Sequence, residues 1–229
     1  MSLLGVRVFI ATNAAGGGKA HRIVAEGAEK HFVPMMPGNL MIITDHVNVM
    51  RRNPLEELAV PLGPVYVAGR SVHSERLIGM ARKTALELTD SVAVFEGTYA
   101  SFPGPTYETA DEVEMSMAMG VHAFGMSTVP DLLIAAACGL ECMAISLITN
   151  QAAGVSGKPL SHEEVTQTGL DSAKPFETFI SCLISAIPVQ ANLHQASLPP
   201  PLLSYAISFS FLSTIFIDIY MLNLLKLHG

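Results

Sequence analysis

Small and polar residues follow several apolar runs of this sequence, at the points where buried strands are expected to end. Four such positions stand out: Thr12-Asn13-Ala14, Tyr99, Met126-Ser127-Thr128 and Thr149-Asn150. In α/β folds, ligands gather beyond the ends of the strands. A loop of small residues, such as the one predicted at 11–18, also lets backbone N–H groups approach a ligand. We therefore expect the chemistry of this protein at this edge of the sheet.

The elements that would position these residues alternate along the chain. Short β-branched apolar runs predict strands, and apolar residues at helical spacing predict helices between them. Thr109 with Glu112 and Ser161 with Glu164 have capping-box spacing, and Thr128 is expected to cap a further helix. Strands are predicted at 6–10, 40–49, 92–99, 121–126 and 140–150, and helices at 74–88, 109–120, 128–139 and 161–188. This order predicts an α/β fold with a mixed, mostly parallel sheet flanked by helices.

The composition limits the class of protein. Of the 229 residues, 50% are hydrophobic and 14% are charged, which fits a domain with a sizeable core. A formal charge of -7 provides no basic stripe for a nucleic-acid backbone, so no nucleic-acid partner is expected. Cys138, Cys142 and Cys182 lie on apolar stretches without a metal-binding spacing. We expect them to be reduced core thiols of a cytoplasmic protein.

The sequence changes character after Pro188, which predicts a domain at 1–188 and an atypical apolar tail at 189–229. Residues 202–227 are apolar or hydroxyl-bearing apart from a few polar side chains, with Asp218 as their only acid and Lys226 as their only base. A run of about 20 such residues is long enough to span a bilayer as a helix, which would make the tail a membrane anchor. A buried Asp218 would oppose this. The alternative is a non-native or alternatively spliced C-terminus that happens to be apolar. At the other end of the chain, the N-terminus does not have the pattern of a signal peptide.

Six segments, taken together and in order, resemble one family. They are Thr12-Asn13-Ala14-Ala15-Gly16-Gly17, Glu96-Gly97-Thr98-Tyr99, Gly104-Pro105-Thr106-Tyr107-Glu108-Thr109, Gly125-Met126-Ser127-Thr128-Val129-Pro130, Ser146-Leu147-Ile148-Thr149-Asn150 and His162-Glu163-Glu164-Val165. This set is similar to the purine nucleoside phosphorylases that act on 6-oxopurine nucleosides as homotrimers. The resemblance covers residues 6–188 and implies a nucleoside phosphorylase-like, three-layer α/β/α fold.

The resemblance implies a phosphorolysis reaction that serves purine salvage. Phosphate attacks the anomeric carbon of inosine or guanosine, and the products are free purine and ribose 1-phosphate. By analogy with glycoside cleavage, the transition state is oxocarbenium-like, with negative charge building on the departing purine. Inorganic phosphate is then a co-substrate, and neither a cofactor nor a metal ion is expected.

The resemblance also implies roles for individual residues. Glu108 would accept a hydrogen bond from N1–H of the purine, and Asn150 would bond N7 and O6 with support from Thr149. Glu108 could instead serve a helix N-terminus, and Asn150 could simply close a turn. Tyr107 would wall the base, Met126 would lie under the ribose, His162 would lie near the 5′-hydroxyl, and Ser127 with the backbone of Ala14 or Ala15 would bind phosphate.

One part of the family pattern is missing. The resemblance implies a Gly/Ser-rich phosphate loop, a histidine and a phosphate-binding arginine upstream of Thr12, and we expect nothing between Met1 and Thr12 to replace them. We therefore expect a sheet that is incomplete at the N-terminus and exposes an apolar edge. A catalytically impaired isoform that binds purine or modulates oligomers stays open as an alternative. Methylthioadenosine phosphorylase, the closest alternative chemistry, would be expected to carry Asp at Asn150.

Overall fold

The computed structural model describes residues 6–26, 28–29, 31–50, 53–56, 67–155, 162–188 and 206–210. Its strands are β1 (Val8–Gly17), β2 (Lys19–Arg22), β3 (Phe32–Pro34), β4 (Leu40–Asn48), β5 (Val94–Ser101), β6 (Val121–Gly125), β7 (Glu141–Gln151) and β8 (Ala206–Ser210). Its helices are η2 (Gly69–Val72), α2 (Glu75–Glu87), α3 (Ala110–Ala118), α4 (Val129–Ala137), α5 (His162–Asp171) and α6 (Ala173–Ala186).

All described strands belong to one mixed sheet, as the alternation of apolar runs predicts. The strand order is β3-β2-β5-β4-β7-β1-β6, and β8 pairs with β1. The pairs β1–β7, β1–β8, β4–β5 and β5–β6 are parallel, whereas β4–β7 and β1–β6 are antiparallel. Because β6 pairs with both β1 and β5, the sheet curls until strands 5, 4, 7, 1 and 6 form a ring.

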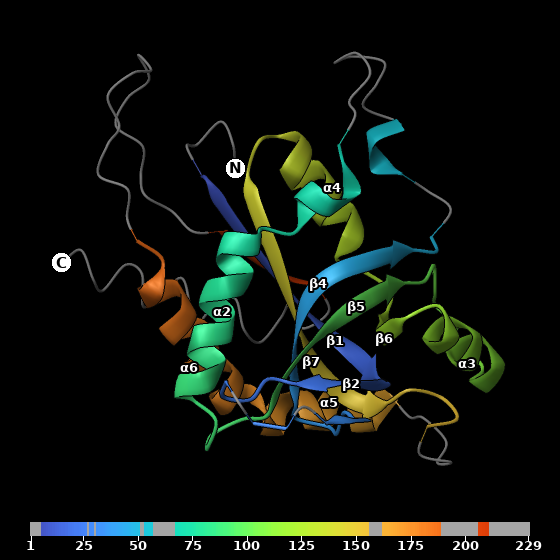
Figure 1. Cartoon of the computed structure of the whole chain (residues 1–229). Coiled ribbons are helices and arrows are strands. Elements are labelled where there is room, and N and C mark those ends of the chain that lie inside the picture. Colours follow the sequence, from blue (N-terminus) through green and yellow to red (C-terminus); the bar gives the residue numbers. More distant parts are fainter. Residues whose placement is uncertain are drawn as a thin grey trace.

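Helices cover both faces of this sheet, because β1 sends alternate side chains to opposite sides. Val8 and Ile10 pack in one core cluster with residues of α2 and α6. Phe9 and Ala11 pack in another cluster with residues of α4. Figure 1 shows α2 and α6 side by side, away from α4. The predicted layering of helix, sheet and helix is therefore confirmed.

Side chains cap the N-termini of two helices. The Ser74 hydroxyl accepts a hydrogen bond from the Leu77 N–H at 3.1 Å and caps α2. Thr109 and Glu112 form both bonds of a capping box at the start of α3. The predicted Ser161 box lies outside the described residues. The single helix expected at 161–188 is wrong, because the chain breaks at Ser172 and forms two helices.

The sequence predicted a loop for the small residues after Ile10, but the structure has a strand there. Residues 11–17 continue β1, because each of them pairs with β7, with a bulge between Ala15 and Gly16. Parallel pairing between β1 and β7 satisfies the hydrogen-bonding groups of the backbone. The low strand propensities of glycine and alanine do not predict this pairing. The strand therefore carries Ala14 and Ala15 directly into the edge where chemistry was expected.

The predicted tail contributes one described element. Strand β8 pairs in parallel with Phe9 to Asn13 of β1. This part of β1 therefore has neighbours on both sides, and the expected exposed edge is not found there. The rest of the tail lies outside the described residues, and the boundary at 188 stays a prediction. Within the described part, no helix is both long enough and apolar enough to cross a bilayer.

The three cysteines differ in their exposure to solvent. Cys142 is buried, but Cys138 and Cys182 are exposed, so the prediction of three core thiols is wrong for two of them. Both lie near the ends of helices or on their outer faces, where apolar neighbours in sequence do not ensure burial.

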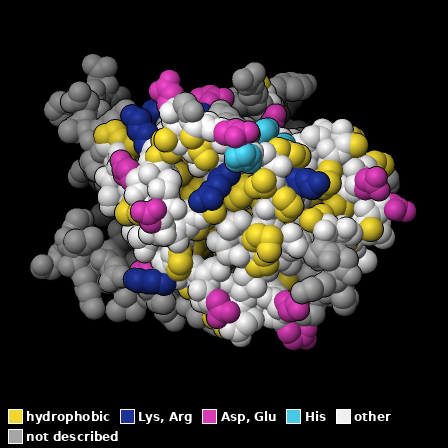
Figure 2. Space-filling view, turned by 60° about the horizontal axis from the view of Figure 1, so that its bottom comes forward, with side chains coloured by type: hydrophobic (Ala, Val, Ile, Leu, Met, Phe, Trp, Pro, Cys, Tyr) yellow, Lys and Arg dark blue, Asp and Glu magenta, His cyan; other side chains and the backbone are white. Residues whose placement is uncertain are grey.

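Figure 2 shows apolar side chains gathered on one face between scattered basic and acidic groups.

Candidate active site

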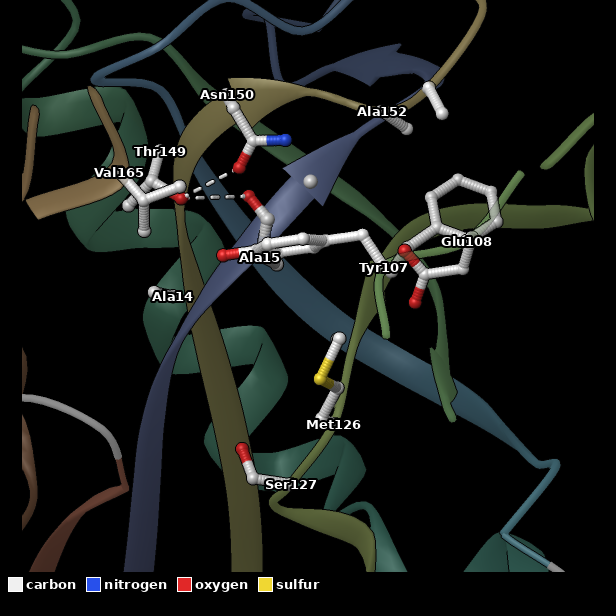
Figure 3. A pocket seen from close by; sticks show the side chains of 14 residues that line it. Ala14, Ala15, Tyr107, Glu108, Met126, Ser127, Thr149, Asn150, Ala152 and Val165 are labelled. Atoms are coloured by element: carbon white, nitrogen blue, oxygen red, sulfur yellow. Dashed lines mark hydrogen bonds between the residues drawn. The ribbon is translucent and has the colours of Figure 1, made fainter. Parts of the chain in front are cut away.

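A cavity opens where β1, β6 and β7 end and α3 begins. It encloses about 640 Å³ of space between atoms, open solvent at its mouth included. The cavity is lined by eight of the predicted site residues: Ala14, Ala15, Tyr107, Glu108, Met126, Ser127, Thr149 and Asn150. In Figure 3, Thr149 and Asn150 lie on one side, Tyr107 and Glu108 on the other, and Met126 and Ser127 below. Segments that are far apart in sequence therefore meet at one site.

The ninth predicted residue is His162, the first residue of α5. The position of its side chain lies outside what the structure describes. Val165, three residues later in the same motif, lines the cavity. The start of α5 thus belongs to this region of the fold, and a role for His162 stays a prediction.

The Glu108 carboxylate has one oxygen without a hydrogen-bond partner among the described residues. This oxygen, Oε1, is buried. Burial raises the pKa of this carboxyl group, the nearby Glu112 raises it further, and the backbone N–H of Glu108 itself lowers it. A buried acceptor without a donor costs free energy, so this oxygen is suited to accept a donor from a ligand.

The alternative explanation for Glu108, service to a helix N-terminus, fits the geometry less well. Thr109 is the N-cap of α3, and its hydroxyl accepts from the Glu112 N–H at 3.2 Å. The Glu112 carboxylate accepts from the Thr109 N–H at 2.8 Å. These two bonds already cap the helix, and Glu108 lies outside it and lines the cavity.

Asn150 is held in place by its neighbours. Its Oδ1 accepts from the Thr149 hydroxyl at 3.0 Å, and its Nδ2 donates to the Gln151 carbonyl at 3.0 Å. The Thr149 hydroxyl also lies 3.5 Å from the Ala15 carbonyl, as the dashed lines in Figure 3 show. The predicted contact between Thr149 and Asn150 is therefore present. An amide nitrogen carries two N–H groups, and the bond to Gln151 uses one of them.

Glycines of β1 make room for this amide. A Cβ on Gly16 would lie 3.1 Å from Asn150 Nδ2, and a Cβ on Gly17 would lie 2.7 Å from a methyl carbon of Ile148. A side chain at Gly16 would therefore crowd the Asn150 amide, and one at Gly17 would displace the Ile148 side chain. The glycines serve the close approach of two strands, not the mobility of a loop.

The backbone of β1 is open at Ala14 and Ala15. On the side of β1 away from β7, the pairing with β8 ends at Asn13 and the pairing with β6 begins at Gly16. Between these two points, no described strand pairs with that side of β1. Any backbone group of residues 14–15 that points away from β7 therefore has no described sheet partner, as an anion site made of N–H groups requires.

The Ser127 peptide is anchored by buried hydroxyl groups. Its carbonyl accepts from Ser101 Oγ at 3.1 Å and from Tyr99 Oη at 3.3 Å, and its N–H points to Tyr99 Oη at 3.4 Å. Tyr99 and Ser101 are completely buried. Burial raises the pKa of Tyr99 to about 12, so its hydroxyl stays protonated at neutral pH. These side chains fix the residue that supplies the only predicted hydroxyl contact for phosphate.

Thr128 has an unusual backbone. Its φ is 77°, which is strained for a β-branched residue, and its side chain makes no capping bond to α4. Thr128 is thus the N-cap residue of α4, as predicted, but its side chain does not cap the helix. The Thr128 hydroxyl instead accepts from Asn13 Nδ2 at 2.8 Å and lies 3.2 Å from Ser127 Oγ. Strain of this kind persists only where the surroundings impose it, and it is common at functional sites.

Sequence reasoning missed the supporting roles of Asn13, Ser101 and Thr128. Asn13 follows an apolar run and was noted only as part of a strand end, and nothing in a local pattern marks Ser101. Asn13 and Thr128 are 115 residues apart, so their hydrogen bond exists only because β1 and the β6–α4 connection meet. A polar residue within an otherwise small and apolar strand is the one signal that could have pointed to Asn13.

Comparison with known proteins places the chain in a family. The family model described as the phosphorylase superfamily matches residues 1–185. The chain belongs to the phosphorylase superfamily. The superfamily match extends over the strands and helices that build the cavity.

Several members of this superfamily are similar to the chain. It is 39% identical over 187 residues to purine nucleoside phosphorylase 1 of Geobacillus stearothermophilus, covering 80% of this chain and 62% of the relative. It is 33% identical over 200 residues to purine nucleoside phosphorylase of Bos taurus, covering 83% of this chain and 63% of the relative. The chain thus spans less than two thirds of the length of these relatives.

Solved structures agree with the sequence comparison. The chain superposes on Schistosoma purine nucleoside phosphorylase in complex with guanosine with a TM-score of 0.67 and 29% identity, covering 82% of this chain and 66% of that one. The complex of a schistosome enzyme with hypoxanthine also gives a TM-score of 0.67, with coverages of 82% and 65%. The nucleoside phosphorylase-like fold predicted from the sequence is confirmed.

Proposed function

We propose that the cavity binds the base of a 6-oxopurine nucleoside, and that the chain is part of a purine nucleoside phosphorylase. The reaction would split inosine or guanosine with phosphate to give free purine and ribose 1-phosphate. The observation that carries this proposal is the buried, unpaired Oε1 of Glu108 in a cavity that also holds the Asn150 amide. The names of similar proteins, which are purine nucleoside phosphorylases, support it.

Base recognition follows from the donors and acceptors on the two sides of the cavity. The Glu108 carboxylate would accept N1–H of a 6-oxopurine, which adenine lacks, and the difference would favour hypoxanthine and guanine. Asn150 would donate to N7. Negative charge builds there as the glycosidic bond breaks, so the bond would strengthen in the transition state. Tyr107, which is 39% exposed at the mouth, would cover the ring, and Met126 would lie against the ribose.

Phosphate capture is assigned to Ser127 and to the open backbone at Ala14 and Ala15. A hydroxyl group and backbone N–H groups can hold an oxyanion without a charged side chain. The anchored Ser127 peptide and the rigid strand β1 would hold these donors before the anion arrives. We propose no metal ion and no cofactor for this step, with inorganic phosphate as the second substrate.

The setting of the reaction is part of the same proposal. We infer a homotrimer in the cytoplasm, acting in purine salvage, because the motif set resembles enzymes with these properties. The exposed side chains of Phe32, Met36, Met115 and Met119 offer apolar surface for subunit contacts. Analytical ultracentrifugation of the purified chain tests the oligomeric state.

One experiment separates an active enzyme from a purine-binding isoform. Purified chain is incubated with inosine and phosphate while hypoxanthine release is recorded, and hypoxanthine binding is measured in parallel by calorimetry. Glu108→Gln should weaken both, whereas Glu114→Gln, an exposed change on the neighbouring helix, should weaken neither. Binding without turnover would favour the impaired isoform. If Glu108→Gln weakens neither hypoxanthine release nor hypoxanthine binding, the proposed site is refuted.

A further inference from the structure

A second cluster of side chains lies where the end of β4 meets the residues before α2. Asp45 and His46 belong to β4, and His73 precedes the N-cap of α2. His46 Nδ1 lies 2.8 Å from His73 Nε2. Each of the three residues offers one ligand atom, and these atoms all lie within 4.8 Å of one another. None of the three lines the purine cavity.

The orientation of the Asp45 carboxylate explains why two consecutive residues can serve one site. Side chains of neighbouring residues in a regular strand point to opposite faces. The register between β4 and β5 shifts between Ile43 and Asp45 but is regular from Asp45 to Asn48, so the bulge alone does not bring the two side chains together. The Asp45 carboxylate also accepts from the His46 N–H at 2.8 Å, so it lies along the strand beside His46.

The surroundings leave the cluster open to an ion. His73 is only 4% exposed, and its Nδ1 is buried without a partner in the described part of the chain. Its ring therefore depends on the single bond to His46, which a bound cation would replace. Asp45 is exposed and His46 is half-buried, so an ion can enter from solvent.

We propose that Asp45, His46 and His73 form a binding site for a divalent transition-metal ion, for which zinc is the probe. Two imidazole nitrogens and a carboxylate oxygen are a ligand set that suits zinc and its neighbours better than magnesium or calcium. Three protein ligands leave the fourth position of a tetrahedral ion to water. The ion would tie the end of β4 to the start of α2, and the site does not depend on the proposed purine chemistry.

The test uses the full chain without an affinity tag, stripped with a chelator and titrated with zinc by calorimetry. One zinc ion per chain is expected, together with a rise in the melting temperature that added chelator reverses. His46→Ala and Asp45→Ala should each weaken zinc binding by at least about tenfold, since even outer-shell partners of a metal contribute that much. His73→Ala should do the same, but this residue is buried, so circular dichroism must first show that the variant folds.

The matched control is His31→Ala, which removes one exposed histidine outside the cluster. It should bind zinc as the parent chain does. Visible absorption of bound Co²⁺ reports whether the same ligands hold the ion, and it should be lost in His46→Ala. The proposal is overturned if the parent chain binds no zinc. It is also overturned if folded His46→Ala and Asp45→Ala bind zinc as tightly as the parent.

Discussion

Replacing Glu108 with glutamine removes a charge from the cavity while keeping the size of the side chain. In the free protein the carboxylate has one oxygen buried without a donor. Its pKa is raised, first by burial and then by Glu112, so its ionised form is disfavoured by the fold. The substitution should therefore stabilise the free protein and weaken purine binding, two effects of opposite sign from one change.

The size of the binding loss follows from the bond that disappears. A hydrogen bond to a charged group contributes about 1.5–3 kcal/mol. Its loss corresponds to a decrease of about 10- to 150-fold in affinity for hypoxanthine. Calorimetry at pH 7 with Glu114→Gln as the control measures this difference. A change of less than about twofold would refute the assignment of Glu108 as a reader of the base.

The stability effect has a defined dependence on pH. Because the folded-state pKa of Glu108 is raised above its usual value of 4.5, its contribution to stability is fully present below that value. This contribution is lost as the pH rises through the raised folded-state pKa. The melting temperature of Glu108→Gln, relative to that of the parent, should therefore increase from pH 4 to pH 7. A lower melting temperature of the variant at pH 7 would show that the carboxylate is stabilised by groups that this reasoning omits.

Three further changes test other parts of the structure. Asn150→Asp should shift preference from 6-oxopurines toward 6-aminopurines, since a carboxylate accepts from the adenine amino group and repels O6; equal calorimetric affinities of both bases for both forms would remove this role. Tyr99→Phe removes the hydroxyl group that bonds the Ser127 peptide. The loss of a neutral hydrogen bond, about 0.5–1.5 kcal/mol, should raise KM for phosphate about 2- to 12-fold without changing hypoxanthine affinity. An equal loss of purine affinity would contradict a role confined to Ser127. Deleting residues 198–229 removes β8 from the edge of β1, so the melting temperature should fall, and an unchanged value would show that this pairing adds no stability.

The sequence by itself determined the local elements and the set of residues that form the cavity. The capping box at Thr109 acts over three residues, so it is readable from spacing alone, and it is present. Polar residues at strand ends predicted where the site lies, and the ends of the parallel strands β1 and β7 do meet there. Eight predicted site residues indeed line one cavity.

Only the tertiary structure decided how these residues are held. The small residues after Ile10 became strand because β7 pairs with them, and Thr128 adopted a positive φ with its hydroxyl bonded to Asn13. The approach of His46 to His73 likewise joins residues 27 positions apart. Local propensities amount to less than about 1 kcal/mol per residue, and the pairing and burial of distant segments override them. These long-range contacts exist only once the whole sheet has formed, and no short pattern in the chain encodes them.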